Sequence, residues 1–177
     1  TRMVFRTMGA LLLIEAVFMT LALGVSLWYG EADSGIFLLS TIITLLAGVI
    51  GLMVGRRAES RMGEREGYVI VAMVWVVFSA FGLFPYYLSG QVNSITDAWF
   101  ESMSGFTTTG ATIIPDLNVI THGLLFWRSL TQWIGGMGII VLSIAILPIF
   151  GLNGMQLYAA EVSGLTYEKV SPRIADT

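Results

Sequence analysis

Four long stretches almost free of charged residues constrain the fold of this chain more than any other feature. They cover residues 4–28, 36–54, 67–88 and 124–150. Each is long enough to cross the roughly 30 Å hydrocarbon core of a bilayer as a helix of about 20 residues. Charged residues make up only 12% of the chain, against about 25% in soluble proteins. We therefore predict an all-α membrane protein with four transmembrane helices, surrounded by membrane lipid.

The composition also excludes several functions. The chain has no cysteine and a single histidine, His122, so disulfides, thiolate catalysis and metal sites built from Cys or clustered His are excluded within one chain. It has no basic cluster suited to nucleic acid. It also contains no nucleophile–base pair and no phosphate-binding glycine loop. We expect neither an enzyme nor a protein with a cofactor or a nucleic-acid partner.

The distribution of arginine and lysine predicts the orientation. These residues occur near the N-terminus, in the loop after the second stretch and in the C-terminal tail: Arg2, Arg6, Arg56, Arg57, Arg61, Arg65, Lys169 and Arg173. The short loop at residues 29–35 carries Glu31 and Asp33 instead. Because cytoplasmic loops carry the excess of Lys and Arg, both termini and the arginine loop should be cytoplasmic. Residues 89–123 should then lie outside or enter the membrane from outside.

Residues 89–123 contain a pattern typical of a re-entrant loop. Ser94 and Asp97 resemble a capping box, followed by a helix over residues 95–105 that is about 16 Å long, or half a bilayer. Residues 106–112 are rich in β-branched side chains and favour an extended path, and five extended residues rise about 16 Å. A half-helix that descends and a strand that returns would match in length. An ordinary external loop with a surface helix is the alternative.

A re-entrant backbone would have a use at membrane depth. Its carbonyl groups are unpaired, so it is tolerated only inside protein or along a watery path. Carbonyl groups that line such a path can replace the hydration shell of a cation. Gly110 can adopt a positive φ and turn neighbouring carbonyls to one side. The negative end of the half-helix would favour a cation near the bilayer centre.

Two segments resemble a known family. DAWFESMSGFTTTGAT at residues 97–112 and RSLTQWIGGMG at residues 128–138 resemble the first pore loop and the following helix of TrkH-type members of the Trk/Ktr/HKT superfamily. The resemblance implies one of four repeats around a potassium pathway, K⁺ as the transported ion, a bacterial inner membrane and a cytoplasmic nucleotide-binding regulator of the TrkA type. It also implies that the K⁺ filter consists of Thr108, Thr109, Gly110, Ala111 and Thr112.

The same resemblance implies three parts. Residues 1–66 would be an extra two-helix hairpin with the arginine loop, residues 67–150 the first helix–pore loop–helix repeat, and residues 151–177 a cytoplasmic link toward a second repeat. A filter needs about four loops. The remaining repeats are therefore expected in further sequence, or else in other copies of the chain. A non-conducting membrane scaffold, in which the loop only packs, is the alternative function.

Several individual residues carry further expectations. Glu101 and Arg128 should lie at similar depth and form an ion pair that supports the filter, because a lone charge in the membrane is costly. Glu15 should be structural, hydrogen-bonded to Thr41 or Thr44. Small residues at Gly51 and Gly55 favour close helix packing. A further set in the fourth stretch would form either a gating hinge or a flat packing surface: Gly135, Gly136 and Gly138.

The orientation gives the first testable prediction. The chain lacks cysteine, so single cysteines can be introduced without background. A cysteine at Gln91 should react with a membrane-impermeant thiol reagent from outside, and one at Ser60 only from inside. Labelling of both positions from the same side would contradict the predicted topology.

Overall fold

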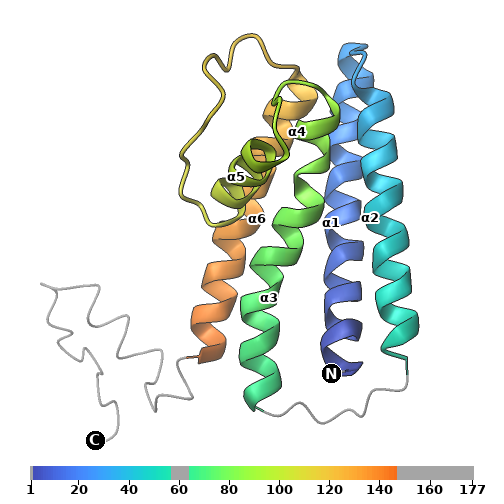
Figure 1. Ribbon diagram of the computed structural model, residues 1–177, viewed down its shortest axis with the longest axis vertical. Coiled ribbons are helices and arrows are strands. Elements are labelled where there is room, and N and C mark those ends of the chain that lie inside the picture. Colours follow the sequence, from blue (N-terminus) through green and yellow to red (C-terminus); the bar gives the residue numbers. More distant parts are fainter. Residues whose placement is uncertain (1, 57–63, 147–177) are drawn as a thin grey trace, which may run out of the picture. The chain divides into compact units, whose positions relative to one another are not determined.

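The computed structural model describes residues 2–56 and 64–146, and the regular structure within these ranges is helical. The helices are α1 (Arg2–Tyr29), α2 (Ser34–Val54), α3 (Glu64–Gly82), α4 (Phe84–Leu88), α5 (Ile95–Phe106) and α6 (His122–Ile146) (Figure 1). Contacts divide the chain into two units, residues 1–139 and 140–177. The packing described below is that of the first unit.

The described helices confirm an all-α membrane protein. Three stretches are long and apolar enough to cross a membrane, namely Arg2–Tyr29, Ser34–Val54 and Val69–Leu88, and they coincide with the first three predicted spans. The fourth predicted span corresponds to α6, which begins at His122 and is described as far as Ile146. Residues 147–150 of that predicted span lie outside the described residues.

The third predicted span is interrupted near its C-terminal end, before Leu88. α3 ends at Gly82, and the five-residue α4 begins at Phe84 with a proline, Pro85, in its first turn. Proline has no N–H, and its ring clashes with the carbonyl one turn earlier, so it separates two helical segments. Leu83 N still donates to Ser79 O at 3.2 Å, which keeps the two segments connected.

α1 and α2 lie side by side along their length (Figure 1). A Cβ atom added to Gly51 would lie 2.9 Å from Gly9 Cα, and one added to Gly55 would lie 2.4 Å from Arg6 Cβ. Both separations are too short for a side chain, so the backbones approach closely only because these residues are glycine. The close packing predicted for Gly51 and Gly55 is confirmed.

The partner predicted for Glu15 is wrong. Thr41 Oγ1 donates to Phe37 O at 2.7 Å and Thr44 Oγ1 to Ser40 O at 2.9 Å. A threonine in a membrane helix is satisfied by its own preceding turn, so neither hydroxyl needs the carboxylate. Glu15 is buried and faces Gly82, and neither of its oxygens has a hydrogen-bond partner among the described residues.

A polar cluster joins the α1–α2 turn to the start of α6. Glu31 accepts hydrogen bonds from the backbone N–H groups of His122 at 2.7 Å and Gly123 at 3.0 Å, and His122 Nδ1 lies 2.8 Å from Glu31 Oε1. The His122 ring stacks on the Tyr29 ring, with 4.0 Å between the ring centroids. The carboxylate thus caps a helix N-terminus, where a negative charge is favourable. The hairpin is thereby attached to the helix that follows the predicted pore loop.

This cluster predicts a pH dependence of stability. Burial raises the pKa of the Glu31 carboxyl, but the hydrogen bonds from Gly123 and His122 outweigh it and hold the pKa below its ordinary value of 4.5. The contribution to stability is therefore present above that value and is lost as the pH falls through the lowered pKa. Glu31→Gln should lower the melting temperature in detergent at neutral pH by on the order of 2 °C.

Asp116→Asn is the matched control, because within the described residues that exposed carboxylate bonds only to Asn118 of its own turn. The control should melt like the unmodified chain at neutral pH. The difference in melting temperature between Glu31→Gln and the unmodified chain should shrink as the solution is acidified. An unchanged difference at low pH would contradict the role given to the Glu31 carboxylate.

Candidate functional site

The half-helix predicted in the loop region is present as α5. It covers Ile95–Phe106, one residue longer than predicted, and Ser94 caps it by accepting a hydrogen bond from Thr96 N at 3.2 Å. The cap is confirmed, although the bond goes to Thr96 rather than to the N–H of Asp97. α5 packs against α3 and α4, at the end of α3 that is near the α1–α2 turn (Figure 1).

The chain reverses sharply where α5 ends. Thr108 and Gly110 have φ values of 56° and 75°, and Ser104 O accepts from Thr109 N at 3.0 Å and from Gly110 N at 3.4 Å. A positive φ is strained for threonine and easy for glycine. The conformation expected of Gly110 is confirmed, and the one at Thr108 was not foreseen.

The predicted filter segment, residues 108–112, lies on the surface of the single chain, with all five residues exposed. Residues 109–114 form no regular structure. The segment therefore follows the irregular returning path that the sequence predicts. Figure 1 shows this loop on the far side of α5 and α6 from the α1–α2 hairpin.

The carbonyl groups of the predicted filter segment fall into two sets. Ala111 O accepts from Ser104 Oγ at 2.6 Å, and Gly110 O accepts from Arg128 Nη2 at 3.4 Å. The carbonyls of the three threonines have no hydrogen-bond donor among the described residues: Thr108, Thr109 and Thr112. Two of the five carbonyls in the predicted filter segment are therefore bonded to protein donors in the single chain.

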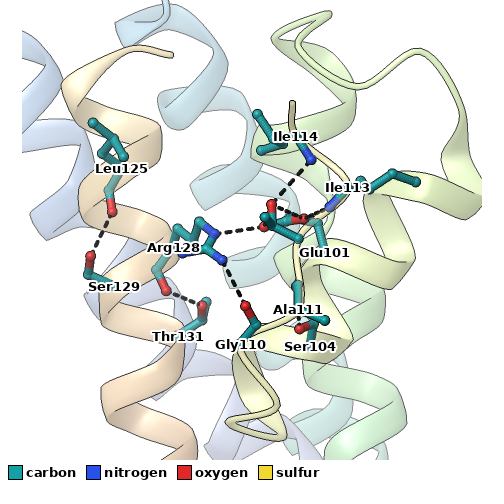
Figure 2. A network of polar contacts seen from close by, with 11 residues as sticks. Glu101, Ser104, Gly110, Ala111, Ile113, Ile114, Leu125, Arg128, Ser129 and Thr131 are labelled. Carbon is teal, nitrogen blue, oxygen red and sulfur yellow. Dashed lines mark hydrogen bonds and ion pairs between the residues drawn. The ribbon is translucent and has the colours of Figure 1, made fainter. Parts of the chain in front are cut away.

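Glu101 and Arg128 form the predicted ion pair. Arg128 Nε lies 2.7 Å from Glu101 Oε1, and the two side chains are 15% and 1% exposed. The arginine reaches from α6 and the carboxylate from α5, and they meet beside the returning loop (Figure 2). A charge-assisted hydrogen bond of this length is among the stronger polar contacts in proteins.

Glu101 also holds the returning loop. Thr112 Oγ1 lies 3.0 Å from each carboxylate oxygen, and Ile113 N donates to Oε2 at 3.0 Å. One buried carboxylate therefore connects α5, α6 and the end of the predicted filter segment (Figure 2). The contacts of Ser104 and Ile113 were missed at the sequence level, because they depend on the path of the loop and leave no periodic signal.

α6 approaches the end of α5 through a glycine. A Cβ atom added to Gly135 would lie 2.0 Å from Phe106 O, which leaves no room for a side chain. A Cβ atom added to Gly136 or Gly138 would make only ordinary contacts, at 3.8 Å from Thr108 Cγ2 and 3.5 Å from Trp75 Cη2. Of the two alternatives raised for these glycines, the flat packing surface is the one that Gly135 forms.

The available ligand atoms limit the chemistry of this site. Among the described residues, no group of three or more His, Cys, Asp or Glu side chains could hold a metal ion. The oxygen atoms that the exposed residues 108–112 could offer to an ion belong to backbone carbonyls and threonine hydroxyls. Neutral oxygens of this kind suit a weakly held monovalent cation, whose hydration shell they can replace.

Curated proteins of potassium-uptake systems are similar to nearly the whole chain. The chain is 43% identical to the Trk system potassium uptake protein TrkH of Salmonella typhimurium over 178 aligned positions, which cover 99% of this chain and 37% of the relative. It is 34% identical to the Trk system potassium uptake protein TrkG of Escherichia coli over 99% of this chain and 37% of that relative. The chain thus spans little more than a third of the length of these relatives.

A solved structure and a family model give the same assignment. The crystal structure of the potassium transporter TrkH from Vibrio parahaemolyticus superposes with a TM-score of 0.81 and 38% sequence identity, covering 90% of this chain and 34% of that chain. The family model described as TrkH, cation transport protein, matches residues 23–176. The chain therefore belongs to the TrkH family of cation transport proteins.

Proposed function

We propose that this chain forms part of a potassium-uptake protein, in which residues 108–112 line one quarter of a K⁺-selective pathway. The single observation that carries the proposal is the exposed returning loop, where the carbonyls of Thr108, Thr109 and Thr112 have no donor among the described residues. Unpaired carbonyls at membrane depth cost several kcal/mol each in hydrocarbon. An ion pathway completed by other repeats would satisfy them.

The organisation of the chain follows from this proposal. Residues 1–66 act as an N-terminal hairpin, residues 67–150 as the first pore repeat and residues 151–177 as the link toward a second repeat. The partners are the other pore repeats and a cytoplasmic nucleotide-binding regulator of the TrkA type. The protein lies in the inner membrane with both termini cytoplasmic, and it transports K⁺ rather than catalysing a reaction.

Glu101 and Arg128 have a supporting role in this proposal. They lie behind the pathway, since the carboxylate is 1% exposed and bonded to Arg128, Thr112 and Ile113. The pair would hold the returning loop at a set distance from α5. It would not contact the ion, because its oxygens are already occupied by protein donors.

Gly110→Ser in the full-length protein tests the pathway. A serine at φ 75° is strained, and its side chain would project beside the ion path. K⁺ uptake should lose affinity, and discrimination between K⁺ and Na⁺ should fall by roughly tenfold or more, which corresponds to about 1.4 kcal/mol. Uptake in cells that lack other potassium transporters gives both quantities.

Gly90→Ser is the matched control. Gly90 has a similar φ of 69° and open space around it, in the loop before α5. It should carry the same backbone strain without altering K⁺ uptake. If both variants transport K⁺ like the unmodified protein, the proposed pathway is wrong and the scaffold alternative gains support.

Glu101→Gln tests the supporting pair. The substitution leaves Arg128 without its ionic partner at membrane depth, which is strongly destabilising for a buried pair. The variant should melt at a lower temperature and take up less K⁺. The double variant Glu101→Gln/Arg128→Gln should recover part of the stability, with a coupling energy on the order of 0.5–3 kcal/mol. If the stability losses of the two single variants simply add up in the double variant, the two residues do not act as a pair.

A further inference from the structure

The ends of α1 and α2 opposite the α1–α2 turn form a surface that the proposed pathway does not use. An open recess of about 620 Å³ is lined by Arg2, Met53, Val54 and Arg56. A second recess of about 450 Å³ shares Met53 and Arg56 and adds Arg6. All three arginine side chains are exposed. They therefore lie around one continuous patch of two recesses.

Close packing of the hairpin places these arginines together. A Cβ atom on Gly55 would lie 2.4 Å from Arg6 Cβ and 2.6 Å from Arg6 N, so the last turn of α2 rests directly on the first turns of α1. Arg56 follows Gly55 in the chain. The like charges are thus held near one another by the backbone and cannot separate without loss of this contact.

Among the described residues, Arg2, Arg6 and Arg56 have no hydrogen bond or ion pair with an acidic side chain. Residues 57–66 contribute three arginines and three glutamates and hence no net charge: Arg57, Arg61, Arg65, Glu59, Glu64 and Glu66. The three arginines of the patch remain as a surplus. Their mutual repulsion would be relieved by a bound anion.

We propose that this patch binds the headgroup of an anionic phospholipid. Arginine donates to phosphate oxygens through a planar fork of N–H groups. Basic recesses between membrane helices on the cytoplasmic side are suited to anionic lipid headgroups. The proposed orientation places the patch at the cytoplasmic leaflet. Lipid binding itself is independent of the pore function.

The walls of the patch favour a lipid over a free phosphate. Met53 and Val54 are 69% and 53% exposed, and Val49 and Leu52 line the second recess. These apolar side chains continue from the arginines along α2. An acyl chain could cover them while its phosphate contacts the guanidinium groups, whereas inorganic phosphate would gain nothing from them.

Native mass spectrometry of the full-length protein tests the proposal. The protein is reconstituted into nanodiscs containing equal amounts of phosphatidylcholine and phosphatidylglycerol and is then released from them. The lipid molecules that remain bound to it are counted by mass. The triple variant Arg2→Gln/Arg6→Gln/Arg56→Gln should retain phosphatidylglycerol on the order of tenfold less. The matched control Arg57→Gln/Arg61→Gln/Arg65→Gln removes the same charge from the adjacent loop and should retain it like the unmodified protein.

A second measurement needs no variant. A photoactivatable phosphatidylglycerol should cross-link to peptides that contain residues 2–6 or 49–56 in the unmodified protein, and excess inorganic phosphate should not prevent it. If both triple variants lost phosphatidylglycerol equally, the lipid would be held by a general attraction to positive charge, and the proposal would be overturned. Unchanged retention in the first variant, cross-links confined to other peptides, or full competition by inorganic phosphate would each overturn it as well.

Discussion

The predicted pore loop depends on one buried carboxylate. Glu101 is 1% exposed and receives hydrogen bonds from Arg128, from Thr112 and from the N–H of Ile113. A buried carboxylate needs such partners, because its desolvation costs several kcal/mol. Conversely, the returning loop has no regular hydrogen-bond ladder of its own, so the N–H of Ile113 needs an acceptor. The two requirements satisfy each other, and they set where the loop lies relative to α5.

The rest of the first unit supports this arrangement by close packing. The backbone of Phe106 at the end of α5 lies against Gly135 of α6. The centroid of the Phe106 ring lies 6.3 Å from that of Trp127 and 5.3 Å from that of Phe78. Trp127 Nε1 donates to Gly82 O at 3.1 Å, at the interruption between α3 and α4. The end of α5 is therefore held by both neighbouring helices, which limits how far the loop after it can move.

Much of this architecture could be predicted from the sequence. The three spans, the half-helix, the Ser94 cap and the positive φ of Gly110 depend on local composition, and all of them are present in the structure. The Glu101–Arg128 pair was predictable as well, since depth along two helices adjacent in the chain follows from counting residues. That Glu15 would lack the predicted threonine partner could not be foreseen, because the face that a helix presents to each neighbour is set by packing.

The sequence by itself determined that this chain enters a membrane, which stretches are long and apolar enough to span it and which segment returns as a loop. Hydropathy and charge act residue by residue through the cost of transfer into hydrocarbon, so a single chain carries that information. Only the tertiary structure decided which carbonyls of residues 108–112 bond to Ser104 and Arg128 and which stay open. That choice depends on the direction of each carbonyl after a sharp reversal, and direction is settled by contacts between segments distant in the chain.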